Sequence, residues 1–271
     1  MNLNANKNTI KTVSILGCGW FGLALAKKLV ATGYTVNGST TTPEKLKSLS
    51  ENGINAFQVN FTAESIEADE TFFLTDVLFI CIPPKRNSSE LNNYPDKIKA
   101  ILKSAEGKTA KFILISSTSV YGDENTAVNE RSETNPDTDS GKMVLAAEQI
   151  LKETCPIDFT IIRFAGLIGP ERNPGRFFAG KKNIPNGLAP VNLIHQQDAV
   201  GVAEAILKNE AFGRIYNACS PEHPTKKDFY TNAAKETGLE IPSFLEEKRS
   251  WKIVEGLNVP EFLDYKFQIK I

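Results

Sequence analysis

The stretch that decides the fold is VSILGCGWFG, residues 13–22 of a 271-residue chain. Its glycines have the spacing G-x-G-x-x-G, follow an apolar run and precede a segment with helical periodicity. In that context Gly17 permits a tight turn, Gly19 lets backbone approach a phosphate, and Gly22 lets helix and strand pack closely. The start of the helix presents free N–H groups and the positive end of its dipole. The stretch therefore predicts a dinucleotide-binding turn.

Short apolar runs alternate with amphipathic stretches through the first part of the chain. The predicted strands are Thr12–Leu16, Tyr34–Ser39, Ile54–Val59, Asp76–Ile82, Lys111–Ser116 and Asp158–Phe164. The predicted helices between them are Phe21–Ala31, Pro43–Ser50, Tyr94–Ser104 and Gly141–Glu153. Strands that are apolar almost throughout are typical of a parallel sheet covered on both faces. We predict an α/β Rossmann fold with a doubly wound parallel sheet.

The pattern changes after residue 165, where glycines, prolines and charges replace the regular periodicity. Residues 10–165 are predicted to form the dinucleotide-binding core, and 191–219 to return to it. Residues 166–190 and 220–271 are predicted to form a small, loop-rich lobe on the substrate side. The elements predicted beyond residue 190 are a helix at Ala199–Leu207, a strand at Arg214–Ala218 and a helix at Thr225–Thr237 with Thr225 as its cap.

Charge and cysteine usage exclude several classes of protein. Lys and Arg number 31 against 32 Asp and Glu, so nothing favours nucleic acid or an anionic membrane as a partner. Four widely spaced cysteines predict neither a local metal site nor a disulfide framework, and fit a reducing compartment. The polar start at Met1–Lys11 lacks the apolar segment of a signal peptide, and no run is long enough to span a membrane. We expect a soluble cytoplasmic protein.

The second strand bears on the choice of cofactor. NAD sites usually carry an acid about 20 residues after the glycines, which binds the ribose 2′-hydroxyl. This chain has no acid there before Glu44. The hydroxyls of Ser39, Thr40 and Thr41 can instead donate to a 2′-phosphate, and Lys45 can add charge; the alternative is a solvated polar loop. The sequence thus favours NADP, with NAD as the alternative cofactor.

Several later motifs resemble those of the extended short-chain dehydrogenase/reductases, the family of sugar-nucleotide epimerases and dehydratases. They are KFILISSTSVYG at 111–122, RFAGLIGP at 163–170, VNLIHQQDAV at 191–200 and IYN at 215–217. The segment NPGRFFAGK at 173–181 further resembles the bacterial YeeZ-type proteins, an atypical branch. The resemblance implies a nicotinamide-dependent protein, often a homodimer, that acts on a small polar substrate such as a sugar nucleotide.

The resemblance also implies a catalytic Ser, Tyr and Lys, of which only the first is present. The Ser falls at Ser117. The family segment Tyr-Gly-x-Ser-Lys-x-x-x-Glu places Ser140 at the Tyr position and Val144 at the Lys position. A serine hydroxyl is a poor acid without an adjacent base, and valine carries no charge. Lys142 lies about 200° around the helix from Val144, so we expect it to point away.

Other residues, or a water molecule, are candidates for the missing acid or base, and further residues are candidates for substrate contacts. Tyr121 lies in the loop after the fifth strand, with packing as the alternative role. His195 ends a later strand, with a structural role as the alternative. Arg176 and Phe177 can clamp a phosphate or carboxylate, unless they form a solvated loop edge.

Ligands of open α/β sheets lie beyond the carboxyl ends of the strands. Besides the glycines and the hydroxyls of the second strand, the predicted cofactor contacts are Trp20, Phe21, Ile82, Pro83, Pro84, Ser116, Phe164 and Gly166. The further predicted substrate contacts are Thr118 and Ser140. We predict an NADP-linked oxidoreductase or epimerase-like enzyme in which Ser117 polarises a substrate oxygen. The alternative is a non-catalytic regulatory protein that senses NADP.

Overall fold

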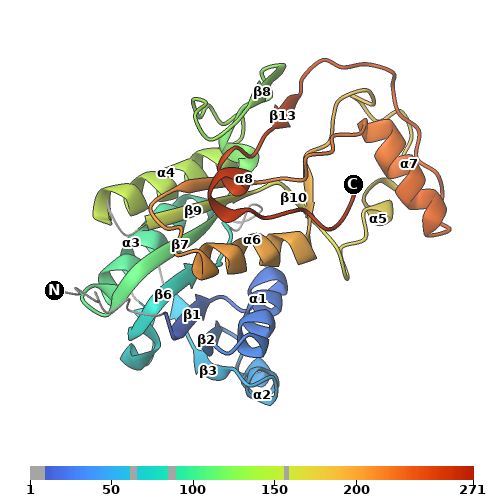
Figure 1. Cartoon of the computed structure of the whole chain (residues 1–271). Coiled ribbons are helices and arrows are strands. Elements are labelled where there is room, and N and C mark those ends of the chain that lie inside the picture. Colours follow the sequence, from blue (N-terminus) through green and yellow to red (C-terminus); the bar gives the residue numbers. More distant parts are fainter. Residues whose placement is uncertain (1–9, 62–65, 85–89, 156–158) are drawn as a thin grey trace.

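The computed structural model describes residues 10–61, 66–84, 90–155 and 159–271 (Figure 1). The predicted strand start at Asp158 and most of the polar N-terminal stretch lie outside these residues. No helix in the described ranges is long and apolar enough to cross a membrane.

A seven-stranded parallel sheet forms the centre of the molecule, in the order β12-β9-β7-β6-β1-β2-β3. Its strands are β1 (Thr12–Leu16), β2 (Thr35–Thr40), β3 (Asn55–Gln58), β6 (Thr75–Ile80), β7 (Thr109–Ser117), β9 (Phe159–Phe164) and β12 (Ile215–Ala218). The chain runs outward from β1 through β2 to β3, then crosses to β6 on the other side of β1. The crevice at this reversal is where doubly wound sheets bind ligands.

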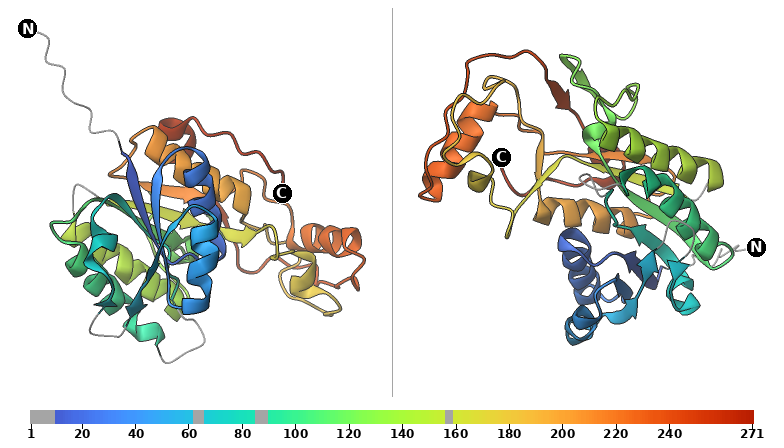
Figure 2. Two further views of the ribbon diagram at one scale, coloured as in Figure 1. Left: turned by 90° about the horizontal axis from the view of Figure 1, so that it is seen from below. Right: turned by 180° about the vertical axis from the view of Figure 1, so that it is seen from behind.

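Helices cover both faces of the sheet (Figures 1 and 2). One face carries α1 (Trp20–Ala31) and α6 (Gln196–Lys208), which pack on each other, with α2 (Leu46–Glu51) nearby. The other carries α3 (Tyr94–Ala105) and α4 (Asp139–Thr154), also in mutual contact. The buried side chains of α1 recur at helical spacing, so its apolar stripe faces the sheet. This confirms the predicted doubly wound Rossmann fold.

Several segments after β9 build the part of the molecule that overhangs the carboxyl end of the sheet (Figure 2). They hold β10 (Gly166–Ile168), which pairs with β11 (Leu193–His195), and β13 (Lys252–Val254), which pairs with β8 (Thr126–Val128). They also hold α5 (Gly175–Phe178) and α7 (Lys226–Glu236), which pack together. Thr225 caps α7 as predicted, because its side chain accepts a bond from the N–H of Asp228.

The last segment of the chain returns to the core. The short helix α8 (Asn258–Leu263) packs against β12 and α6. The remaining short elements are β4 (Asn60–Phe61), β5 (Ile66–Glu67) and the 3-10 turns η1 (Pro43–Lys45), η2 (Glu70–Phe73), η3 (Leu91–Asn93) and η4 (Thr118–Val120).

Candidate functional site

A cavity of about 790 Å³ lies at the carboxyl ends of β1, β6, β7 and β9, and we call it the sheet-end pocket. Its lining residues come from the glycine-rich turn, from the segments after these strands, from α4 and from the overhanging segments. They are Gly17, Gly19–Gly22, Cys81–Pro84, Ile115–Ser119, Val144, Phe164–Leu167, Arg172, Asn192 and Lys252. The pocket therefore lies at the sheet reversal, as the glycine-rich stretch predicts.

The glycine-rich turn has the backbone that its sequence predicts. Gly17 has a φ of +100°, a conformation that L side chains rarely adopt. A Cβ at Gly22 would clash with the carbonyl oxygen of Gly17, so the helix can pack this closely only with glycine. At Gly19 a Cβ would have no atom within 4 Å, so this residue borders open space. These three glycines shape a turn and leave its outer side free.

The start of α1 faces the pocket without a side-chain cap. Its N-cap is Gly19, and the first turn contains no acidic residue. The N–H of Leu23 makes the first bond within the helix, to the carbonyl of Gly19. The N–H groups of the first helical turn, Trp20–Gly22, therefore remain for a ligand, at the positive end of the helix dipole. The arrangement suits an anionic group such as a phosphate.

The hydroxyls predicted to select the cofactor lie next to this turn but do not line the pocket. Ser39 is 1% exposed, and its Oγ accepts a 2.9 Å bond from the N–H of Gly17. Ser39 thus holds the turn and has no open face for a 2′-phosphate, which corrects its predicted role. Thr40 accepts a 3.1 Å bond from the N–H of Thr42, and Thr41 is exposed. Their role toward a 2′-phosphate stays a prediction.

A loop of hydroxyl side chains follows β7 on the opposite side of the pocket. Ser117 caps η4, with its Oγ accepting a 3.1 Å bond from the N–H of Ser119. Its hydroxyl hydrogen stays available to donate, as its predicted role requires. Within the described part of the chain, the buried Oγ of Ser119 has no hydrogen-bond partner. An unpaired buried hydroxyl is costly, so this one marks a place where a ligand can supply the partner.

The structure shows what occupies the Tyr and Lys positions of the family segment. Val144 lines the pocket and presents only methyl groups there. Ser140 does not line it, and its Oγ lies 3.3 Å from that of Thr138. The exposed Lys142 bonds Asp139 at 3.2 Å, so it points away from the pocket as its place on the helix predicts. Helix α4 therefore brings neither an acid nor a cation into the pocket.

Tyr121 is buried and does not line the sheet-end pocket. It is 1% exposed, and its hydroxyl contacts the carbonyl of Asn129, Oδ1 of Asn217 and Nη1 of Arg163. Burial raises the pKa of this hydroxyl, although the nearby guanidinium opposes the rise. With its hydroxyl bonded within the protein and outside the pocket, Tyr121 has the placement that the packing alternative expects.

A buried ion pair lies next to the pocket and connects β7, β9 and α4. Arg163 on β9 donates to Glu148 on α4 through Nη2 at 2.6 Å and Nε at 2.9 Å. Ser116 at the end of β7 donates to the same carboxylate at 2.6 Å. The Ser116 hydroxyl, predicted to contact cofactor, is thus occupied within the protein. Sequence reasoning missed this network, because a single sequence does not show which charges are buried together.

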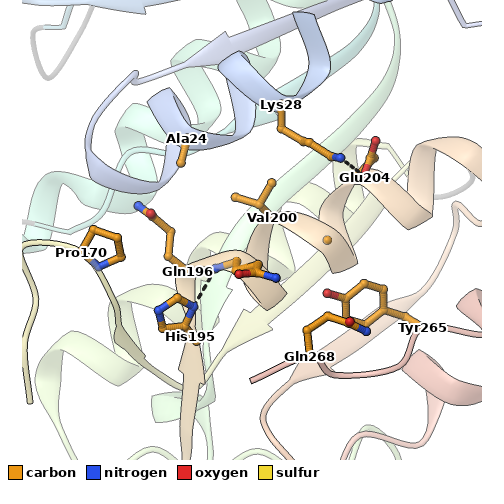
Figure 3. Close-up of a pocket in the computed structure, with 11 residues that line it drawn as sticks. Ala24, Lys28, Pro170, His195, Gln196, Val200, Glu204, Tyr265 and Gln268 are labelled. Carbon is orange, nitrogen blue, oxygen red and sulfur yellow. Dashed lines mark hydrogen bonds and ion pairs between the residues drawn. The ribbon is translucent and has the colours of Figure 1, made fainter. Parts of the chain in front are cut away.

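His195 lies in a different cavity, of about 620 Å³, between α1, α6 and the C-terminal segment (Figure 3). It caps α6, with Nδ1 accepting a 3.2 Å bond from the N–H of Gln197. The Tyr265 hydroxyl donates to Asp198. Besides His195, the polar residues that line this cavity are Lys28, Gln196, Gln197, Glu204, Tyr265 and Gln268. His195 is therefore not brought to Ser117, and the structural alternative describes it.

The pair predicted to clamp an anion is also outside the pocket. Arg176 and Phe177 are exposed on α5, and the Phe177 ring packs 6.1 Å from that of Tyr230. Among the described residues, the arginine that lines the pocket is Arg172, whose guanidinium lies 4.2 Å from the centre of the Trp20 ring. The segment after β10 thus supplies a cation, but from a residue that sequence reasoning missed.

Lys252 on β13 is a further cation among the described residues that line the pocket, and it was also missed. Its ammonium donates to the carbonyl of Tyr121 at 2.8 Å and to Asp123 at 2.7 Å, with 14% of the side chain exposed. Asn192 fixes its backbone by donating to the Lys252 carbonyl. No signal pointed to Lys252, because β13 is a three-residue strand within the loop-rich end of the chain.

The structure brings most predicted contacts together. The predicted residues that line the sheet-end pocket are Gly17, Gly19, Trp20, Phe21, Gly22, Ile82, Pro83, Pro84, Ser116, Ser117, Thr118, Phe164 and Gly166. No Asp or Glu is among the lining residues that the structure describes, whereas two cations are. The pocket is therefore suited to an anionic ligand. Across the described ranges, no cluster of His, Cys, Asp or Glu is placed to hold a metal ion.

Solved structures share this architecture. UDP-glucuronic acid 4-epimerase from Bacillus cereus, solved with NAD, aligns with a TM-score of 0.75 at 18% identity, over 96% of this chain and 94% of that chain. A functionally unknown conserved protein from Silicibacter pomeroyi aligns with a TM-score of 0.74 at 22% identity, over 96% and 94%. The fold is that of the extended short-chain dehydrogenase/reductase epimerases.

Sequence comparison then gives the family. Residues 12–118 match the family described as NADP oxidoreductase coenzyme F420-dependent. The protein YeeZ of Escherichia coli K12 is 36% identical over 265 residues, which are 96% of each chain. The chain belongs to the YeeZ family, as its segment at 173–181 predicts.

Proposed function

We propose that the protein binds NAD(P) in the sheet-end pocket, with NADP preferred. The observation that carries this is one continuous cavity from the glycine-rich turn to the hydroxyl loop at Ser117–Ser119. Open space at Gly19, the uncapped start of α1 and the unpaired Ser119 hydroxyl all fit a dinucleotide ligand. The matches to an NADP oxidoreductase family and to an epimerase solved with NAD support the same class of cofactor.

The preference for NADP rests on the end of β2. No carboxylate lies there to bind a ribose 2′-hydroxyl or to repel a 2′-phosphate, and the first acid beyond it is the exposed Glu44. Thr40 and Thr41 retain hydroxyls at this position, since the buried Ser39 is committed to the turn. We expect NADP to bind more tightly than NAD.

The activity we propose is that of an oxidoreductase or epimerase-like enzyme on a small polar substrate. With NAD(P) held in the sheet-end pocket, the chemistry supplied would be hydride transfer to or from the substrate carbon. Ser117 donates a hydrogen bond to the reacting oxygen. When a carbonyl is reduced, the Lys252 ammonium gives that oxygen a proton. The electron pair of the broken N–H bond stays on Nζ of Lys252, and solvent then protonates this nitrogen again. Lys252 has this role because Tyr121 and His195 lie outside the pocket and the Cys81 thiol has its pKa raised by burial.

The test of this activity follows NADPH oxidation across a panel of carbonyl compounds and sugar nucleotides. Ser117→Ala and Lys252→Met should each lower turnover about a hundredfold or more, within the range of general acid catalysis. Lys142→Met is the matched control, because it removes an exposed lysine of α4 that faces away from the pocket. Turnover that is equal in Lys252→Met and Lys142→Met would exclude Lys252 as the proton donor.

A non-catalytic, NADP-sensing protein is the second candidate function. The observation that favours it is helix α4, which carries Ser140 and Val144 where the family has its Tyr and Lys. Such a protein binds the dinucleotide and changes its oligomeric state or its affinity for a partner, without chemistry. Substrate-dependent oxidation of NADPH that is lost in Ser117→Ala would eliminate this candidate.

A further inference from the structure

Arg172 stacks on the tryptophan that begins the dinucleotide-binding helix. Its guanidinium carbon lies 4.2 Å from the centre of the Trp20 ring, and both residues line the sheet-end pocket. Trp20 is the first residue of α1, whose uncapped N–H groups face the same pocket. The stack therefore places a cation beside the positive start of a helix, and none of the described Asp and Glu residues pairs with it.

Hydrogen bonds fix both members of the stack. Gly169 and Arg172 bond each other through their backbones at 3.0 and 3.3 Å, so residues 169–172 form a tight turn. The Trp20 indole donates to the carbonyl of Pro170 in that turn at 2.6 Å. Gln196 donates to the Trp20 carbonyl at 2.9 Å. The turn after β10 is thus tied directly to the start of α1, although the two lie far apart in the sequence.

The Arg172 side chain keeps its donors for a ligand. A guanidinium has five N–H donors in a planar fork that matches phosphate. The described residues give the Arg172 guanidinium no ion pair, and they show none of its N–H groups donating to another residue. The side chains of Arg163, Arg214 and Arg249 each bond a carboxylate or carbonyl oxygen, whereas those of the exposed Arg131, Arg172 and Arg176 show no such bond among the described residues. Arg172 is oriented by a ring contact and retains its donors.

We propose that Arg172 and Trp20 form a clamp on the diphosphate of the bound dinucleotide. The inference rests on the proposed function, because it assigns the clamp to the cofactor of the same pocket. The N–H groups at the start of α1 bind the diphosphate from one side. Arg172 binds it from the other, with the Trp20 ring holding the guanidinium plane in place.

The clamp acts on the diphosphate and not on the 2′-phosphate. The ribose that carries the 2′-phosphate is selected at the end of β2, around Thr40 and Thr41. Arg172 lies instead at the start of α1, where the diphosphate binds. The diphosphate is common to NAD and NADP. Arg172 should therefore strengthen the binding of both cofactors by the same factor and leave the preference between them unchanged.

The test measures dissociation constants of the full-length protein for NADP⁺ and NAD⁺ by isothermal titration calorimetry. Arg172→Met removes charge-assisted hydrogen bonds, so both dissociation constants should rise about tenfold to a hundredfold. Arg172→Lys keeps the charge without the planar fork, so it should give an intermediate loss. Arg176→Met is the matched control, since this exposed arginine on α5 lies outside the pocket. Circular dichroism and Tm establish that each variant is folded.

The outcomes separate this inference from the function on which it rests. A wild-type protein that binds neither nucleotide contradicts the proposed function. If the wild type binds the nucleotides and Arg172→Met has the same affinity for them as Arg176→Met, the clamp alone is contradicted. If Arg172→Met binds NADP⁺ more weakly but binds NAD⁺ as tightly as the wild type does, the assignment of Arg172 to the diphosphate is overturned. If Arg172→Met fails to fold, Arg172→Lys decides: an affinity equal to wild type overturns the clamp, and weaker binding of both cofactors supports it.

Discussion

Replacing Glu148 with glutamine should strongly destabilise the protein. The substitution keeps the volume of the side chain but removes the charge that faces Arg163 at 2.6 and 2.9 Å. Both side chains are almost completely buried, at 2% and 0% exposure. Removing one member of a buried ion pair costs about 3–5 kcal/mol, because the remaining charge is left without compensation. In a chain of this size each kcal/mol lowers Tm by about 2–4 °C. We expect a fall of roughly 10 °C.

The assay is thermal unfolding of wild type, Glu148→Gln and Asp139→Asn, followed by circular dichroism. Asp139 pairs with Lys142 at 3.2 Å on the same helix, but both are exposed, so this control should cost less than about 1 kcal/mol. Replacing both buried charges, as Glu148→Leu with Arg163→Met, should recover much of the lost stability. A Tm of Glu148→Gln equal to that of Asp139→Asn would refute the argument that the substitution leaves the buried Arg163 charge without compensation.

Three further predictions concern the buried network, the turn and the thiols. Tyr121→Phe leaves one Arg163 donor without its partner, so thermal unfolding should show a loss of about 1–3 kcal/mol while turnover is retained. Gly22→Ala introduces a clash with the turn, so both Tm and dinucleotide affinity should fall together. Burial raises the pKa of Cys18 and Cys219 to about 12, so little thiolate forms at pH 8; mass spectrometry should find iodoacetamide on them only after unfolding.

The sequence predicted the core because its signals are local. The glycine spacing and the apolar runs predict the turn, the sheet and the helices that cover it, and the structure has them with ends shifted by a few residues. The expected strand to Ile82 ends at Ile80, and α6 begins at Gln196 because His195 caps it. Local patterns depend on residues that are close in the sequence, so they can be interpreted without knowledge of the tertiary structure.

The pocket was predicted less completely, because its cations come from distant segments. Arg172 and Lys252 lie in stretches without periodicity, and only tertiary contacts with Trp20 and Tyr121 bring them to the pocket. Tyr121 shows the converse limit. Its place after β7 suggests catalysis, but its hydroxyl is bound within a buried network. Residue type and position alone do not distinguish these roles.

The most direct test of the dinucleotide site compares wild type with Gly19→Thr in a titration with NADP⁺. A Cβ at Gly19 has free space and the backbone is extended, while threonine is about as good an N-cap as glycine, so Tm should change by no more than about 3 °C. The added side chain occupies the side of the turn that the diphosphate must approach. We predict saturable binding by wild type and at least about tenfold weaker binding by the variant. Equal affinities, or no binding by wild type, would contradict a dinucleotide site at this turn.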